Sequence, residues 1–268
     1  MTFRRPGVVN KLRWRRNMCA EEFTYPRART TRPAKVTMPS TKEAAAYWDP
    51  ERSSGAYPSL ERFLADLVDL MRLEIEELHR LGCTYVQFDA PQYAALLDPQ
   101  IRESYRQRGL DPDRMVDLAI ELDNAVIDGF DRRGMIFGLH ICRGNNESMF
   151  YASGGYEPIA EKVFRRARFH RFLLECDDER SGGFEPLRHM PDDRVVVLGL
   201  VSTKRMHLEA EEELVRRIHE ATRCVPLERL AISPQCGFAS TWPGNRVTPE
   251  VQRQKLELVA RVARTVWG

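Results

Sequence analysis

The sequence lacks any apolar run long enough to cross a membrane. Its longest apolar runs, near Met135 and Val195, fall far short of the roughly 20 residues that a spanning helix needs. It also lacks a strong net charge, since the formal charge of its 268 residues is only +2. Such a chain has no overall electrostatic preference for nucleic acid or for an acidic membrane surface. We therefore expect a soluble protein with neither kind of partner.

Cysteine is scarce for a chain of this length, and no signal peptide is recognisable at its start. The six cysteines lie at positions 19, 83, 142, 176, 224 and 236. Few cysteines in a long chain argue against a disulfide framework and for reduced thiols in the cytosol. We therefore expect a cytoplasmic protein.

Acidic residues are absent before Glu21, whereas the same segment is rich in arginine and lysine. The basic residues are Arg4, Arg5, Lys11, Arg13, Arg15 and Arg16. A transit peptide or a nucleic-acid arm would have this composition, but so would an unstructured basic tail. Residues 1–34 have no sustained apolar period, so we predict a basic, mostly irregular segment over 1–34 and a single folded domain over 35–268.

From Lys35 onward, short apolar runs alternate with amphipathic stretches. Strands are predicted near residues 35, 85, 135, 171, 195 and 230. Helices are predicted over about 60–82, 111–134, 156–167 and 209–222, with a closing helix that starts at Thr248. Strands that alternate with helices imply parallel βα units, so the predicted class is α/β.

Candidate metal ligands stand where the predicted strands end. His140 and Cys142 are two residues apart, so they point to the same side of a strand. An imidazole and a thiol on one side suit zinc, but a catalytic zinc site needs a third protein ligand. Two later strands end on Glu175 or Cys176 and on Cys236. Each residue taken singly is equally typical of a buried core side chain.

Four segments in this order carry a family resemblance: GLHICRGN, FLLEC, VVVLGLVSTK and LAISPQCGFAS. They resemble the C-terminal catalytic barrel of cobalamin-independent methionine synthase, and more closely its short relatives, a group that includes the epoxyalkane:coenzyme M transferases. The resemblance runs from about Lys35 to the C-terminus. It implies a TIM (β/α)8-type barrel and a zinc ion held by His140, Cys142, Glu175 and Cys236. Cys176 is then a structural residue.

The predicted strands number six, whereas such a barrel has eight. The family's first two strands would precede the segment KVTMPS, so we expect a barrel that lacks them in this chain. An opened barrel exposes sheet edges, which usually need covering. We therefore expect either a homo-oligomer that covers these edges or a natural protein that is longer.

The resemblance also implies how a substrate thiol is bound. Asp89 matches the aspartate that binds the amino group of homocysteine, although it equally suits the cap of a turn. The family usually has Glu next, whereas this chain has Ala90. Ser40, at the exit of the first predicted strand, is a second candidate for the thiol pocket.

The methyl donor is less clearly marked. Methionine synthases carry a His at the end of the strand that matches Val195–Ser202, where this chain reads Ser202-Thr-Lys204. His207 is a candidate catalytic substitute from the loop, and Lys204 is a candidate for binding an anionic group. A methyl-corrinoid needs no proton on its leaving group, so the absent His admits donors besides methyltetrahydrofolate.

These observations predict a zinc-dependent S-methyltransferase that acts on a small thiol such as homocysteine. The alternatives are alkyl transfer from another electrophile, such as an epoxide to coenzyme M, and a non-catalytic, truncated barrel subunit.

Overall fold

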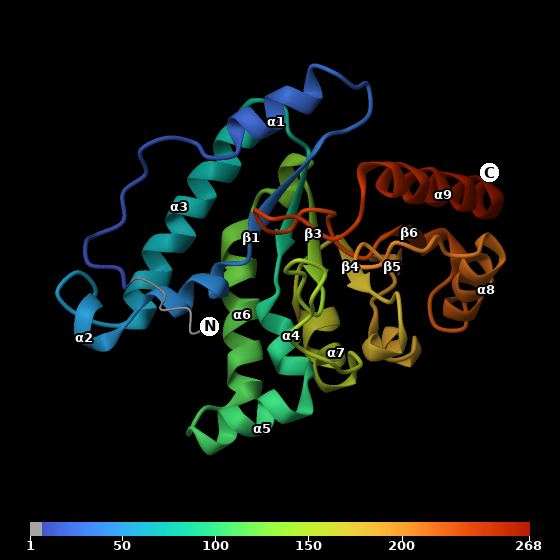
Figure 1. The fold of residues 1–268 in the computed structure, drawn as a ribbon. Coiled ribbons are helices and arrows are strands. Elements are labelled where there is room, and N and C mark those ends of the chain that lie inside the picture. The colour runs from blue at the N-terminus through green and yellow to red at the C-terminus, as the bar shows by residue number, and fades with distance from the viewer. Residues whose placement is uncertain (1–6) are drawn as a thin grey trace. The chain divides into compact units, whose positions relative to one another are not determined.

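A parallel sheet forms the framework of residues 7–268, which are the residues described by the computed structural model of this chain (Figure 1). Its six strands follow one another in chain order across the sheet. They are β1 (Lys35–Pro39), β2 (Tyr85–Asp89), β3 (Ile136–Ile141), β4 (Arg171–Glu175), β5 (Val195–Val201) and β6 (Leu230–Pro234). Every strand predicted from the sequence is present, and the α/β class is confirmed.

Helices occupy most of the connections between the strands. The α-helices are α1 (Ala20–Arg27), α2 (Pro50–Ser53), α3 (Leu60–Arg80), α4 (Gln92–Leu97), α5 (Pro99–Gln107), α6 (Pro112–Ile127), α7 (Glu157–Arg166), α8 (Glu211–Ala221) and α9 (Pro249–Trp267). Short 3-10 helices are η1 (Thr41–Tyr47), η2 (Asp131–Arg133), η3 (Glu179–Ser181), η4 (Glu185–His189) and η5 (Leu227–Arg229). Among the residues described, no helix has both the length and the apolar character of a membrane span.

The chain divides into two compact units. The first comprises Met1–Ala90 and Asp117–Gly138, and the second comprises Pro91–Val116 and Leu139–Gly268. The second unit therefore holds the ends of β3, β4, β5 and β6, where most of the predicted site residues stand. The boundary predicted between residues 34 and 35 stays a prediction.

The helix starts follow from local capping. The Asp111 carboxylate accepts from the backbone N–H of Asp113 at 2.9 Å, just before α6 begins at Pro112. Thr248 caps α9 in the same way, and Pro249 occupies the first helical position. Such residues satisfy N–H groups that have no partner within the helix. The sequence signals for these two helices are thus confirmed.

The strands that lead to the site are buried along nearly their whole length. In β3 and β5 every residue after the first is buried, which is typical of parallel strands covered on both faces. Gly199 in β5 is required by close packing, because a Cβ there would lie 2.8 Å from Gln235 Cα. The segment that follows β6 can therefore approach β5 closely.

Two parts of the chain differ from the prediction. The segment 1–34, expected to be mostly irregular, contains α1, and the short helices α4 and α5 were not predicted. Residues 12–18 are also not a free tail, because they are tied to the first unit. The backbone N–H of Leu12 donates to the Tyr57 hydroxyl at 2.7 Å, and the buried Glu74 of α3 accepts from Trp14 Nε1 and from the backbone of Met18.

A buried carboxylate joins the end of β1 to α6 within the first unit. Asp123 is fully buried and accepts from the Ser40 hydroxyl at 2.7 Å and from the Thr41 backbone N–H at 3.0 Å. Burial raises the pKa of Asp123 from 3.8 to about 6, although these hydrogen bonds lower it. Its charge is thus a cost to the folded state at neutral pH.

Asp123→Asn should flatten part of the pH dependence of stability. The folded protein binds the Asp123 proton more tightly than the unfolded chain, so this group's contribution to stability is lost as pH rises from about 4 through about 6. The loss is on the order of 3 kcal/mol at most. Urea unfolding of both proteins between pH 4 and 7.5 measures it, with the exposed Asp128→Asn as control. Identical pH profiles for wild type and Asp123→Asn would contradict this assignment.

Candidate metal centre

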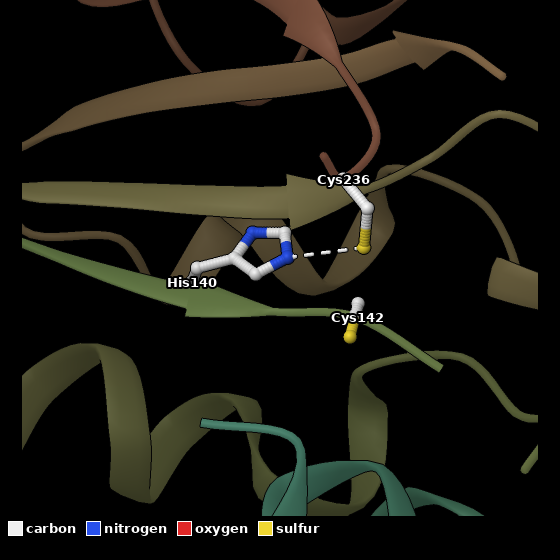
Figure 2. A group of neighbouring side chains, drawn as sticks. All are labelled: His140, Cys142 and Cys236. Carbon is white, nitrogen blue, oxygen red and sulfur yellow. Dashed lines mark hydrogen bonds between the residues drawn. The ribbon is translucent and has the colours of Figure 1, made fainter. Parts of the chain in front are cut away.

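Three soft ligand atoms converge in the second unit. His140, Cys142 and Cys236 place an imidazole nitrogen and two sulfurs all within 4.8 Å of one another (Figure 2). His140 Nε2 lies 3.3 Å from Cys236 Sγ. In a tetrahedral zinc site, bond lengths of about 2.0–2.3 Å place such ligand atoms roughly 3.5–3.8 Å apart. The donor set therefore suits zinc, and the three atoms lie close enough together to share one ion.

The ends of two strands position these ligands. His140 lies in β3 and Cys142 directly follows it, so the two-residue period of the strand turns both to one side. The chain then bends at Gly144, which has a φ of +90° and whose backbone N–H donates to Cys142 Sγ at 3.3 Å. A Cβ at Gly144 would clash with the Tyr151 ring. A glycine is therefore needed beside this thiol.

The two thiols influence each other's ionisation. A hydrogen bond from Cys236 lowers the pKa of Cys142, and hydrogen bonding and charge from His140 lower it further. The same hydrogen bond raises the pKa of Cys236, which keeps the shared proton. Cys142 is thus the first of the pair to become a thiolate, the form that binds metals.

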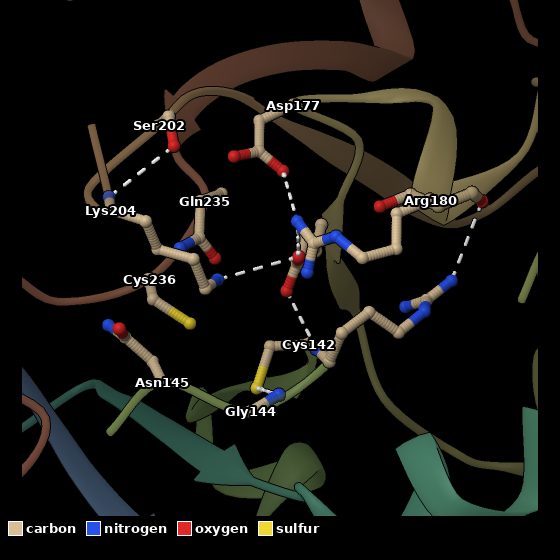
Figure 3. Close-up of polar contacts among 12 residues, drawn as sticks. Cys142, Gly144, Asn145, Asp177, Arg180, Ser202, Lys204, Gln235 and Cys236 are labelled. Atoms are coloured by element: carbon tan, nitrogen blue, oxygen red, sulfur yellow. Dashed lines mark hydrogen bonds and ion pairs between the residues drawn. The ribbon is translucent and has the colours of Figure 1, made fainter. Parts of the chain in front are cut away.

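Glu175, at the end of β4, lies outside this group of three. Its carboxylate is fully buried and accepts from the backbone N–H of Arg143 at 2.6 Å (Figure 3). The other carboxylate oxygen lies 3.1 Å from Arg180 Nη2 and 3.5 Å from Lys204 Nζ. Burial raises the pKa of Glu175, while the charge of Lys204 lowers it. Three of the four ligands implied by the resemblance therefore converge, and the fourth is held by cations.

Amide and hydroxyl groups join the loops that follow β3, β5 and β6. Asn145 Nδ2 donates to the Gly237 carbonyl at 3.0 Å and to the Ser240 hydroxyl at 2.9 Å. Thr203, fully buried, accepts from Gln235 Nε2 at 2.9 Å. These bonds connect the loop of Cys142 to the loop of Cys236.

Sequence reasoning missed several of these residues. Arg180 lies in the short helix η3 after β4, where the sequence gives no spatial partner, but the run Asp177-Asp178-Glu179-Arg180 was a usable signal. Tyr156 was read only as a helix start. Its hydroxyl lies 2.9 Å from the Ile141 carbonyl and 3.0 Å from the Glu175 carbonyl, so it bridges the ends of β3 and β4.

Comparison with known proteins identifies the family. Residues 2–264 match the family model described as "Cobalamin-independent synthase, Catalytic domain". The chain belongs to this family. The matched residues begin well before Lys35, where the resemblance was expected to start.

Curated members of the family are similar over most of this chain. The chain is 37% identical over 235 residues to the uncharacterized protein YxjH of Bacillus subtilis. These aligned residues are 87% of this chain and 61% of that protein. It is 28% identical over 239 residues to methionine synthase of Pyrococcus abyssi. Here the aligned residues are 88% of this chain and 60% of that protein. The chain thus spans only about three fifths of these relatives.

Solved structures of the family confirm the TIM-barrel-type fold. The putative vitamin-B12 independent methionine synthase from Listeria monocytogenes matches with a TM-score of 0.74 and 29% identity, over 98% of this chain and 73% of that one. A B12-independent methionine synthase from a Shewanella species, solved in complex with selenomethionine, matches with a TM-score of 0.75 and 20% identity. The match covers 98% of this chain and 70% of that one.

The remaining site residues predicted from the family resemblance lie in both units. In the first unit Asp89 is half-buried at the end of β2, and its carbonyl accepts from the backbone N–H of Ser40 at 2.8 Å. Ser40 is only 1% exposed, and its hydroxyl donates to Asp123. In the second unit His207 is exposed, and its carbonyl accepts from Lys255 Nζ. Their roles toward a substrate stay predictions.

Cys176 lies outside the group of three candidate ligands. It directly follows Glu175 in the sequence, and its side chain is buried. Burial raises its pKa to about 12, so it remains a neutral thiol.

Asn145→Ala should weaken metal binding without removing a ligand. The amide holds the loops of Cys142 and Cys236 together, and loss of such outer contacts typically costs about 10- to 100-fold in metal affinity. Competition with a chromophoric chelator for Zn2+ measures the affinity. The exposed neighbour Asn146→Ala is the matched control. Equal affinities for the two variants would show that this amide does not position the ligands.

Proposed function

We propose that this chain is the catalytic domain of a zinc-dependent thiol methyltransferase of the methionine-synthase type. The observation that carries the proposal is the convergence of His140, Cys142 and Cys236 within 4.8 Å in a chain of this family. Zinc bound there lowers the pKa of a substrate thiol and leaves its sulfur nucleophilic at neutral pH. His140, Cys142 and Cys236 would hold the metal, together with Glu175 as the fourth ligand that the resemblance implies.

The proposed reaction moves a methyl group to the sulfur of a small thiol such as homocysteine. The sulfur loses its proton and forms a bond to the methyl carbon, while the bond between that carbon and the donor breaks. The donor keeps the bonding electron pair, so no net oxidation occurs. The methionine synthases among the relatives support homocysteine as the acceptor.

Asp89 is the proposed partner of the acceptor's ammonium group. Its half-buried carboxylate stands at the exit of β2, where the family places an aspartate for this purpose. Ser40 follows β1 at the same level, since Pro39 and Asp89 are register partners. Because its hydroxyl already donates to Asp123, Ser40 contributes to the pocket mainly by fixing the backbone there.

The loop after β5 bears on the choice of donor. Methyltetrahydrofolate leaves as an amine and needs a proton, whereas a methyl-corrinoid does not. Lys204, near the place of the family's His, is paired with Glu175, and His207 is exposed in the loop. These features favour a donor whose leaving group needs no proton.

Purified protein should hold about one zinc per chain, and Cys236→Ser should lower zinc affinity by roughly 100-fold or more, because a charged soft ligand is lost. Elemental analysis and chelator competition test both statements. Cys176→Ser, at a buried thiol outside the ligand group, is the matched control. Protein purified without chelators that contains no zinc, and takes none up, would refute the proposal.

Zinc-loaded protein should methylate homocysteine faster with a methyl-corrinoid than with methyltetrahydrofolate. Asp89→Asn should raise the KM for homocysteine, since a charged hydrogen bond of about 1.5–3 kcal/mol, or roughly 10- to 100-fold, is lost. Parallel assays of methionine formation with both donors measure these effects. Faster turnover with the folate would refute the donor preference. Activity only with an epoxide and coenzyme M would indicate the alternative alkyl transfer, and no alkylation at all would indicate a non-catalytic subunit.

A further inference from the structure

An ion pair whose lysine is fully buried joins α9 to the loop after β5. The Lys255 side chain has no exposed surface, and its Nζ lies 2.9 Å and 3.0 Å from the two carboxylate oxygens of Glu209. Nζ also donates to the His207 carbonyl at 2.7 Å. These contacts match the three hydrogens of an ammonium group, and every partner lies in the segment after β5.

Both ends of this loop are held in place. At its far end the Glu209 carboxylate also accepts from the Ser202 N–H at 2.9 Å, which closes the segment 202–209 into a loop. At its start the Thr203 hydroxyl accepts from Gln235 Nε2 at 2.9 Å, and the Thr203 carbonyl accepts from Asn245 Nδ2 at 2.9 Å. Both of these donors follow β6, in the segment that carries one of the candidate metal ligands.

The residues between these fixed points present apolar side chains to the solvent. Met206 is 48% exposed and Leu208 is 42% exposed. The loops after β3 and β6, which carry the two candidate thiol ligands, have exposed apolar side chains as well: Met149, Phe150, Tyr151 and Trp242. Exposed apolar side chains on neighbouring loops are typical of a surface that binds a ligand.

Stability alone does not explain a fully buried lysine at this place. Taking two charges out of water is costly, and well-packed apolar residues of similar volume often stabilise a protein as much or more. A satisfied buried ion pair is, however, well suited to fixing one conformation of the segments that it joins. Supporting contacts of this kind hold binding groups in their productive geometry.

We infer that Lys255 is a positioning residue, which acts through Glu209 to hold the loop 204–208 in the conformation that binds the methyl donor. This inference rests on the proposed function. Met206 and Leu208 then form preordered apolar surface on a loop that is bonded to the metal-bearing segment. Such a surface fits a donor with a broad apolar face, such as the corrin ring of a methyl-corrinoid, and a preordered loop loses less entropy when that donor binds.

Removing both charges of the pair tests the inference on the full, zinc-loaded chain. The variant Lys255→Met/Glu209→Gln leaves no buried charge without a partner, so it avoids the large destabilisation that a single substitution causes. The matched control is Arg253→Met/Glu257→Gln, which removes an exposed ion pair with a distance of 3.0 Å from the same helix. Thermal unfolding confirms that both variants are folded before they are compared.

Trypsin cleavage after Arg205 reports opening of the loop and does not depend on activity. Arg205 is exposed within the loop, and Arg108, exposed between α5 and α6, gives a reference site. In the buried-pair variant, cleavage after Arg205 should be about 10-fold or more faster relative to cleavage after Arg108, because the loop opens more often. The control variant should be cleaved like wild type. Mass spectrometry of the fragments measures both rates.

Steady-state kinetics with methylcobalamin and homocysteine give the second readout. The KM for methylcobalamin should rise about 10-fold or more in the buried-pair variant, because a small displacement of binding groups has effects of this size. The KM for homocysteine and the zinc affinity should change less than about 3-fold, as for sites that share no contacts. Met206→Ala/Leu208→Ala should raise the same KM without faster cleavage after Arg205, because it removes contacts to the donor and leaves the ion pair intact.

Unchanged cleavage after Arg205 in the buried-pair variant would overturn the inference, because the pair would then not hold the loop. Faster cleavage with unchanged kinetics would show that the pair is only structural, and an equal rise in the KM of both substrates would show general loosening. Either result would overturn the inference while leaving the proposed function intact. Zinc-loaded wild type that transfers no methyl group from any donor would overturn the proposed function, and the role of the loop in donor binding with it.

Discussion

The parallel direction of the strands is the constraint on which the candidate metal centre depends. Because neighbouring strands run the same way, the residues that follow them meet at one edge of the sheet. The ends of β3, β4, β5 and β6 thus supply Cys142, Glu175, Lys204 and Cys236, although nearly a hundred positions separate the first from the last. The close approach allowed by Gly199 brings the chain after β6 against β5. The close packing of these strands is therefore also what brings the candidate ligands together.

The electrostatic surroundings of the groups at these strand ends differ. The sulfurs of Cys142 and Cys236 have mainly each other and His140 as partners, so a metal ion can replace a shared proton at little cost in other contacts. The buried carboxylate of Glu175 is paired with the cations Arg180 and Lys204. A buried charge that loses one partner without gaining another destabilises the folded state strongly. The thiols and the carboxylate can all bind a metal when they are deprotonated. They differ here in the partners that surround each of them.

The sequence predicts the sheet well because its strands are short apolar runs bounded by polar or glycine-containing segments. It predicts His140 and Cys142 as a pair because their spacing equals the strand period. The helices α1, α4 and α5 were missed, since Pro26 interrupts α1 and Pro99 breaks the pattern between α4 and α5. The partners of Glu175 were missed for a different reason. Arg180 lies in η3, which is only three residues long, and Lys204 lies in a loop, so no sequence period relates the position of either residue to its direction in space.

Lys204 follows β5 and faces Glu175, so the loop after β5 presents a cation at this strand end. A histidine there has a pKa near neutrality and can both hold and release a proton, whereas a lysine ordinarily keeps its charge. The Lys204 ammonium lies 3.5 Å from the buried Glu175 carboxylate, so its charge has a partner in the protein. The loop after β5 is thus suited to fixing charge rather than to delivering protons. The proposed preference for a donor that leaves without needing a proton follows from this arrangement, because a lasting positive charge at this strand end is a poor source of protons.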